Sequence, residues 1–324
     1  MDKGTLGKLK SLIVLSIFFS PVLFAFEFID NERAYLATSG KVHAKALMSN
    51  RKKNEFSFGD SDLALKAKYF VTDSTFISSG TEAEIKLDEE RNEDQFSISQ
   101  YYLGVGKESF GSLTYGKHTT SSENLNGVDF SQIFGGQSNL NLIGAKRETL
   151  KYVYNNELFS LNMTYGLKNN QQDQSLHELF GQLKLADTTI KGGVGATKTQ
   201  NNLYQKESIY SHLTAIISSG DIDLGSTYYF NKSEETRNQK DSTYTHAVAI
   251  AGRLDWTKEL TFFSGYEFVT QIQPQKDKKS KHNLYLGSSY QLNDWSAIQV
   301  ELNHLDPLVG SNQVNIGIGV AFFL

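Results

Sequence analysis

The amino-acid sequence predicts an all-β fold, a transmembrane antiparallel β-barrel of about 16 strands with a long inward-folded loop. Runs of about ten residues alternate between apolar and polar side chains along the chain, as expected for strands with one apolar face. Proline occurs only 3 times in 324 residues, and strands cannot spare the amide that proline lacks. Aromatic residues reach 12% although only 39% of the chain is hydrophobic, a balance typical of barrels with aromatic girdles.

The first segment, residues 1–25, is predicted to be a signal peptide, which leaves residues 26–324 as the barrel domain. Three lysines precede an apolar run over residues 12–24, and Ala25 offers a small side chain at a plausible cleavage point. An uncleaved membrane anchor is the alternative, but the run is shorter than the roughly 20 residues needed to span a bilayer. The segment therefore indicates export.

The clearest strands are runs whose alternate residues are apolar, so that each run turns one side outward. The runs carry these outward residues: Leu63, Leu65, Ala67, Tyr69 and Val71; Phe159, Leu161, Met163, Tyr165 and Leu167; Ile222, Leu224, Ser226, Tyr228 and Phe230; Leu284, Leu286, Ser288, Tyr290 and Leu292; Ile298, Val300 and Leu302. Residues 314–324 alternate almost without fault, and we expect this strand to close the barrel against the first one.

Two kinds of break separate these runs, and they tend to alternate. Short turns rich in Asp, Asn, Gly and Ser are expected at residues 72–74, 107–109, 155–157, 186–188, 219–221, 257–259 and 293–294. Longer polar loops are expected near residues 49–60, 88–94, 118–146, 169–175, 199–203, 232–241, 273–281 and 305–311. Short turns at one rim and long loops at the other are the layout of a bacterial outer-membrane barrel. Because residues 95–106 alternate poorly, fourteen or eighteen strands remain possible, and a soluble β-sandwich or β-solenoid is the alternative fold.

The faces opposite the apolar ones are highly charged. The expected inward residues include Lys41, His43, Lys45, Asp62, Lys66, Lys68, Glu82, Glu84, Lys86, Arg147, Thr149 and Lys151. Burying such charges in a dry core would be costly, and sixteen strands enclose more space than side chains fill. The sequence therefore predicts a water-filled pore.

Four of these residues, Lys41, Lys45, Lys66 and Lys68, have two interpretations. They form either a solvated face with no specific task or a basic wall whose field favours anions or orients dipolar solutes.

The longest break, residues 118–146, mixes polar residues with a large apolar and glycine content. A loop surrounded by water has little reason to carry that much apolar surface, so we expect it to fold inward, pack on the wall and narrow the channel. Glu123 and Asp129 are then the acidic partners across from the lysines. The alternative is an external loop that packs on itself or on a neighbouring subunit.

Residues 110–117, the Phe134-Gly135-Gly136 triplet and residues 149–152 together resemble the fifth strand, constriction loop and sixth strand of the Gram-negative general porins. The resemblance implies a sixteen-stranded, trimeric outer-membrane channel for small hydrophilic solutes. The chain departs from the family where Gln132 and Ile133 replace the usual Pro-Glu, which removes a loop carboxylate. It also ends on Leu324, where the family tends to end on Phe.

The expected function is therefore passive diffusion of small hydrophilic solutes and ions through a homotrimeric outer-membrane pore, without a cofactor and in contact with outer-membrane lipid. A net charge of −4 argues against a nucleic-acid partner, and the absence of cysteine excludes disulfide and thiolate chemistry. A solute-selective channel, for example for a sugar, would need an aromatic slide in the lumen. Its possible members are Tyr102, Tyr210, Tyr229 and Tyr285.

An outer-membrane barrel enzyme and an adhesin are the alternatives from other functional classes. The 7 histidines show no spacing typical of a zinc site, and residues 192–198 lack the ending of a phosphate-binding loop. A Ser/His/Asp site built from distant strands is recognised by geometry, which sequence does not give. The acidic residues within 88–94 are either a solvated loop or a latch on a neighbouring subunit.

Overall fold

The computed structural model describes residues 27–51, 53–58, 61–86, 95–140, 147–166, 173–200, 205–236, 240–274 and 278–323. The predicted signal peptide and the acidic loop of residues 88–94 lie outside the described residues.

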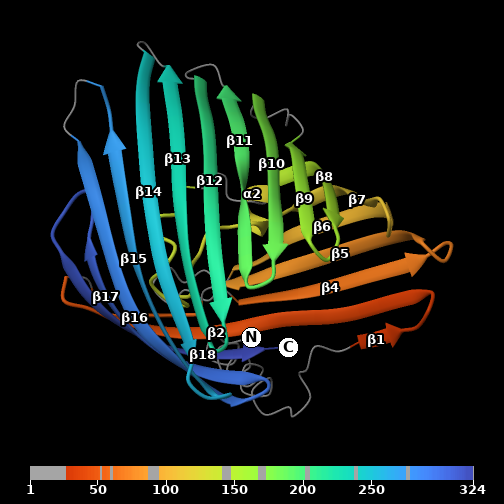
Figure 1. The fold of residues 1–324 in the computed structure, drawn as a ribbon, viewed down its shortest axis with the longest axis horizontal. Coiled ribbons are helices and arrows are strands. Elements are labelled where there is room, and N and C mark those ends of the chain that lie inside the picture. Colours follow the sequence, from red (N-terminus) through yellow and green to blue (C-terminus); the bar gives the residue numbers. More distant parts are fainter. Residues whose placement is uncertain are drawn as a thin grey trace, which may run out of the picture.

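Sixteen long strands form one closed antiparallel barrel in the described part of the chain, so the predicted fold class is confirmed. They are β2 Ala34–Ser49, β4 Ser61–Phe70, β5 Thr75–Lys86, β6 Gln95–Lys107, β7 Gly111–His118, β8 Arg147–Asn155, β9 Phe159–Gly166, β10 Asp173–Leu185, β11 Thr188–Gln200, β12 Gln205–Ser219, β13 Ile222–Thr236, β14 Lys240–Asp255, β15 Leu260–Ile272, β16 Lys279–Asn293, β17 Ser296–Asp306 and β18 Gln313–Phe323. Figure 1 shows them following one another around the wall in chain order.

Three short elements complete the described structure. The strands β1 Glu27–Asp30 and β3 Glu55–Ser57 pair with opposite edges of β2, and the helix α2 covers Ser121–Asn124. No described helix is long and apolar enough to cross a membrane.

Closure occurs between the first long strand and the last one. β18 pairs with β2 from Asn315 opposite Ser49 to Phe323 opposite Lys41. The other edge of β2 pairs with β4 over Ala34 to Lys41. The predicted closure by the final strand is thus confirmed, and both edges of the sheet are satisfied.

The connections follow the predicted alternation. The short ones join β4 to β5, β6 to β7, β8 to β9, β10 to β11, β12 to β13, β14 to β15 and β16 to β17. Most of the connections at the opposite ends are longer, and the longest joins β7 to β8. The longer loop predicted near residues 232–241 is wrong, because β13 continues to Thr236 and β14 begins at Lys240. The turn chemistry read from Asp, Asn, Gly and Ser therefore located one rim of the barrel correctly.

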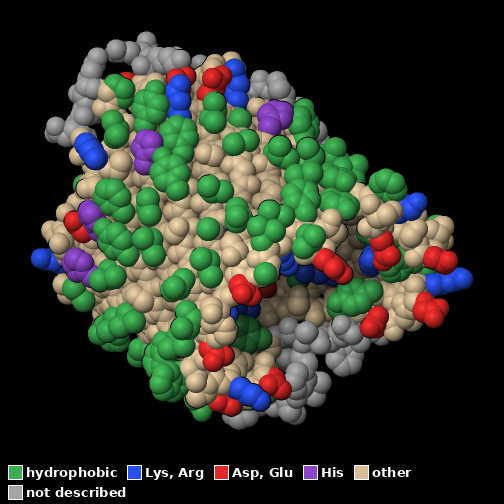
Figure 2. Space-filling model, viewed as in Figure 1, with side chains coloured by type: hydrophobic (Ala, Val, Ile, Leu, Met, Phe, Trp, Pro, Cys, Tyr) green, Lys and Arg blue, Asp and Glu red, His purple; other side chains and the backbone are tan. Residues whose placement is uncertain are grey.

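The outer surface carries the predicted apolar faces. Leu65, Met163, Leu224, Leu286 and Val300 all expose more than 40% of their surface although they are hydrophobic. Figure 2 shows such side chains spread across the middle of the outer wall. Exposed apolar residues on this scale require a lipid environment.

A β-bulge explains why residues 95–106 alternate poorly. Glu82 of β5 pairs with Gln100 of β6, but the next residue, Ala83, pairs with Ile98, so Ser99 is an extra residue. Its hydroxyl donates to the Glu82 backbone oxygen at 3.2 Å and to the Glu82 carboxylate at 2.8 Å. Before the bulge the outward residues have even numbers, such as Ile98, and after it they have odd numbers, such as Tyr101. The alternation is therefore interrupted within this strand.

Several aromatic rings on the inner face lie flat over a glycine of the neighbouring strand. Tyr210 lies opposite Gly195, Tyr285 opposite Gly265, Tyr102 opposite Gly80, Phe180 opposite Gly193, Phe263 opposite Gly287 and Phe76 opposite Gly106. In each pair a Cβ on the glycine would collide with the ring. Glycine thus lets bulky rings lie along the wall instead of projecting into the interior.

We expect Gly265→Ala to lower the free energy of unfolding by about 1–3 kcal/mol, because the added methyl group must displace the buried Tyr285 ring. Urea unfolding of the protein in phospholipid vesicles would measure the loss. Gly181→Ala is the matched control, since its new Cβ would meet no neighbouring atom closer than 3.3 Å. Equal losses in the two variants would contradict the role given to the glycine–aromatic pairs.

Candidate functional site

The connection between β7 and β8 lies against the inner wall over its described part, residues 119–140. Its contacts are with side chains that point away from the apolar outer face, such as Glu178, Thr227 and Glu301. The described contacts run from β8 at the start of the loop to β18, where Ile133 and Phe134 approach Gly317. The loop therefore covers the inner face of the wall between β8 and β18.

Three wall carboxylates hold the loop, and each binds a loop serine. The Glu178 carboxylate accepts hydrogen bonds from the Ser121 backbone amide at 2.7 Å and from the Ser122 hydroxyl at 2.5 Å. The Glu301 carboxylate accepts from the Ser131 hydroxyl and the Gln132 amide, both at 2.6 Å.

The third carboxylate, Glu267, accepts from the Ser138 amide at 2.9 Å and from the Ser138 hydroxyl at 2.8 Å. The Asn283 side-chain amide donates to its other oxygen at 2.6 Å and to the Phe134 carbonyl at 3.0 Å. Glu178, Glu267 and Glu301 are only 7%, 3% and 0% exposed. A buried carboxylate is costly without hydrogen-bond donors, and a buried amide is costly without an acceptor. The loop supplies the donors and the wall supplies the carboxylate acceptors.

Donors on the wall also bind loop carbonyl oxygens. The Lys151 ammonium donates to the Thr119 carbonyl at 2.7 Å, at the start of the loop. The Lys281 ammonium donates to the Gln137 side-chain oxygen at 2.6 Å, near the end of the described segment. The loop backbone is thus matched to wall groups along its length.

Apolar contacts fill the spaces between these polar anchors. Leu125 packs with Phe180 and Tyr210, and Val128 packs with Ala249 and Ala251. Leu140 packs against Tyr229, Ala247 and Val269. The apolar content noted in the sequence of the loop therefore faces the wall, where its burial stabilises the loop.

Burial excludes three of the four tyrosines that were possible members of an aromatic slide. Tyr210, Tyr229 and Tyr285 are 2–3% exposed because the loop covers them. The Tyr210 hydroxyl donates to Glu178 at 2.5 Å, and the Tyr285 hydroxyl donates to Asp129 at 3.1 Å. These rings support the loop and cannot contact a passing solute, whereas Tyr102 is half-buried.

The four predicted lysines lie on neighbouring strands. Lys41 and Lys45 are on β2 and half-buried, and Lys66 and Lys68 are on β4. Lys66 is exposed on the face opposite Leu65. The Lys68 ammonium lies 4.3 Å and 4.0 Å from the ring centres of Phe70 and Phe76, so these rings hold it.

The remaining predicted charges belong to the loop and to β8. Glu123 is on α2, and Asp129 follows it in the loop. Burial against the wall raises the pKa of Asp129 to about 6, and burial also raises the pKa of Glu123, although both side chains keep contact with solvent. The position of Arg147 in β8 is described, but its side chain lies outside the described residues.

Sequence reasoning missed the three anchoring carboxylates. Glu178, Glu267 and Glu301 each alternate with outward apolar residues, which marks them as inward. That pattern does not distinguish an anchor from a solvated lining residue. The serines at positions 121, 122, 131 and 138 offered a complementary signal, but pairing them with wall residues requires the three-dimensional path of the loop.

Within the described residues, no group of three or more His, Cys, Asp or Glu side chains could hold a metal ion.

The fold and the arrangement of the interior define the class of protein, a transmembrane β-barrel with an internal loop. Comparison with known proteins identifies its family. A sequence model of the Gram-negative porin family matches residues 13–306. The chain belongs to this family and resides in the outer membrane. Comparison with curated proteins gives no match.

Solved structures of outer-membrane proteins share the fold. OmpT of Vibrio cholerae, expressed in the outer membrane, is 22% identical with a TM-score of 0.82, and the alignment covers 92% of this chain and 100% of that chain. A trimer form of in-vitro folded OmpT is 23% identical with a TM-score of 0.80, covering 90% and 100%. An anion-selective porin from Comamonas acidovorans is 14% identical with a TM-score of 0.76, covering 90% and 100%.

We expect Glu301→Ala to loosen the middle of the loop, because the Gln132 amide and the Ser131 hydroxyl lose the carboxylate they donate to. The Ser131 hydroxyl also accepts from the Phe134 amide at 2.8 Å, so this turn of the loop loses its attachment to the wall. A buried amide left without an acceptor costs about 1–3 kcal/mol. Hydrogen exchange at the Gln132 and Phe134 amides, followed by mass spectrometry, should therefore become faster. Glu148→Ala is the matched control, because this strand carboxylate binds the Tyr101 hydroxyl and not the loop. Unchanged protection in the Glu301→Ala variant would contradict the anchoring role.

Proposed function

We propose that this barrel is a passive diffusion channel for small hydrophilic solutes and ions, with the loop of residues 118–146 as its constriction. The observation that carries the proposal is the attachment of the loop to the wall from β8 to β18. A loop fixed inside the barrel occupies part of the cross-section permanently, which sets a size limit without closing the pore. Transport of this kind is downhill and needs no catalytic residue or cofactor.

The proposed lining has a basic and an acidic side. Its residues are Lys41, Lys45, Lys66, Lys68, Arg147, Glu123 and Asp129. Lys41 to Lys68 belong to β2 and β4, whereas the two carboxylates belong to the loop. Opposite charges on two sides of a narrow passage would orient dipolar solutes and set ion preference.

We further propose a homotrimer and removal of residues 1–25 during export. The trimer form of the similar Vibrio cholerae protein supports the first idea. On β2 the residues in register with outward Leu63 and Leu65 are Gly40 and Thr38, and such short side chains would allow close approach of a neighbouring barrel. Native mass spectrometry of the exported protein would give the subunit number and the mass of the processed chain.

The principal test is single-channel conductance of the refolded protein in a planar bilayer under a salt gradient. The proposal predicts stable conductance, in three steps for a trimer. Persistent absence of conductance from a folded and inserted barrel would contradict the channel and favour an enzyme or an adhesin. A binding constant for one sugar, with conductance blocked by that sugar, would instead favour a solute-selective channel.

Lys66→Glu should shift the reversal potential toward cation preference, because it replaces a positive charge on the inner wall with a negative one. Lys117→Glu changes a lysine of β7 whose neighbour Tyr115 faces outward on the same side of the strand. This control should leave the reversal potential unchanged. Equal shifts in both variants would place the effect outside the lumen.

Ion preference should also depend on pH near the pKa of Asp129, which burial raises to about 6. Above this pH the carboxylate is charged and favours cations; as pH falls through 6 it takes up a proton and anion preference increases. Asp129→Asn should remove this step and resemble the wild type at low pH throughout. Reversal potentials between pH 5 and pH 7 provide the measurement, and an unchanged step in the variant would assign the titration to another group.

A further inference from the structure

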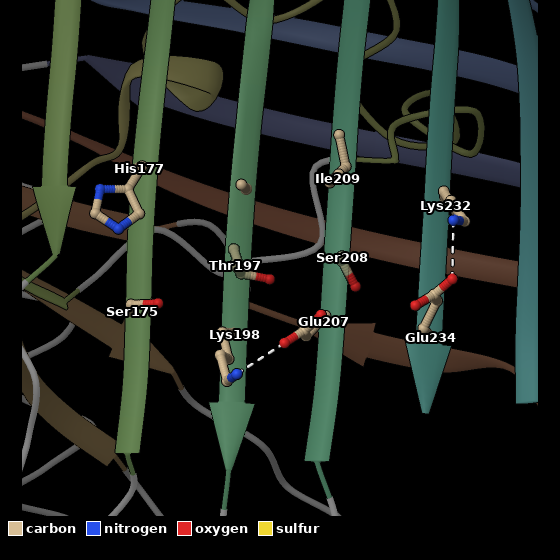
Figure 3. Close-up of a pocket in the computed structure, with 10 residues that line it drawn as sticks. Ser175, His177, Thr197, Lys198, Glu207, Ser208, Ile209, Lys232 and Glu234 are labelled. Atoms are coloured by element: carbon tan, nitrogen blue, oxygen red, sulfur yellow. Dashed lines mark ion pairs between the residues drawn. The ribbon is translucent and has the colours of Figure 1, made fainter. Parts of the chain in front are cut away.

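A cluster of charged side chains occupies the outer face of β10 to β13, near the rim at which the long connection between β7 and β8 also lies. Lys198, Glu207, Lys232 and Glu234 line a shallow pocket of about 250 Å³ together with His177. Figure 3 shows the side chains on four neighbouring strands, with each lysine turned toward a glutamate. This cluster, called the outer charged pocket below, takes no part in the lumen.

The pocket lies on the same face as the lipid-exposed side chains. Ile209, which also lines it, is 56% exposed, and Val194 and Leu213 farther along the same strands are 55% and 62% exposed. Figure 2 shows charged side chains gathered at the upper edge of the wall, above the band rich in hydrophobic ones. Because long connections mark the external end of an outer-membrane barrel, the pocket lies at the level of the external lipid headgroups.

The charges are arranged so that the two lysines surround a repulsive pair. Glu207 lies directly opposite Glu234 across β12 and β13, and like charges in register destabilise a sheet. The Lys198 ammonium is 2.8 Å from the Glu207 carboxylate, and the Lys232 ammonium is 2.8 Å from Glu234.

The side chains of Lys198 and Lys232 remain 45% and 35% exposed. Exposed ion pairs of this kind contribute little to stability, so each lysine can share its ammonium with a second anion at small cost. The Tyr244 ring, 5.8 Å from the Lys232 ammonium, further restricts where that lysine points.

We propose that Lys198 and Lys232 bind the phosphate of a lipid headgroup in the outer charged pocket. A lipid phosphate is held at this depth by its acyl chains, next to the exposed apolar side chains that those chains would cover. Lys198 and Lys232 come from β11 and β13, on either side of β12, and their flexible side chains can turn from the glutamates toward a group with several anionic oxygens. The lysines thereby attach the barrel to particular lipids at its external rim.

The test measures lipid selectivity at the protein surface by electron spin resonance. The folded protein is placed in phosphatidylcholine vesicles, and the association of spin-labelled phosphatidic acid is compared with that of spin-labelled phosphatidylcholine. The wild type should prefer phosphatidic acid several-fold, and the double variant K198Q/K232Q should lose most of this preference. Heat-dependent gel mobility checks that each variant is a folded barrel.

Lys117→Gln is the matched control, because Lys117 lies on the outer face of β7, where its ammonium donates to the Ile98 carbonyl at 3.2 Å. An equal loss of preference in this variant would overturn the proposal, since any surface lysine would then suffice.

Two further outcomes would also overturn it. If Glu207→Gln with Glu234→Gln abolishes the preference, and removal of divalent ions does the same, a metal bridge and not the lysines holds the phosphate. If inorganic phosphate displaces phosphatidic acid at equal concentration, the pocket binds a soluble anion. Increased preference in the glutamine variants, where the lysines lose their competing carboxylates, would support the lysine contact.

Discussion

A polar backbone brought inside a barrel must find hydrogen-bond partners on the wall, and the rest of the interior follows from this requirement. Here Glu178, Glu267 and Glu301 receive loop amides and serine hydroxyls, while Lys151 and Lys281 donate to loop oxygens. Carboxylates and loop are stable only together, because either one alone would leave buried polar groups without partners. The path of the loop is therefore specified at separate points along the wall from β8 to β17.

This arrangement gives the interior two different sides. From β8 to β18 the wall is covered, and its large aromatic rings are packed between glycines and the loop. The strands β2 and β4 carry Lys41, Lys45, Lys66 and Lys68 on the inner face. The side covered by the loop and the side that carries these lysines therefore differ both in packing and in charge.

Strands and rims could be predicted because each depends on local chemistry. Lipid and water enforce a period of two, and turn residues mark one rim. The pattern failed at Ser99, because an extra residue in one strand is defined only by its partner. The inward packing of the loop could be predicted from its apolar residues, but its anchors could not. In the sequence, an inward glutamate such as Glu301 has the same pattern of neighbours whether its carboxylate binds water or the Gln132 amide. The burial of Tyr210 and Tyr285 could not be predicted for the same reason, because alternation gives the face on which a side chain lies and not what covers it.

The pairing of β2 with β18 has a consequence for how the molecule assembles. Residues such as Ser49 and Asn315 meet although almost the whole barrel separates them along the chain. Contacts at such sequence separation require a large loss of chain entropy before they stabilise anything, which slows folding. Until β18 arrives, β2 and the growing sheet present open edges that can pair with other chains. Self-association of the newly made chain therefore competes with closure of the barrel until β18 pairs with β2. The open edges of the sheet need protection from other chains until this last strand is in place.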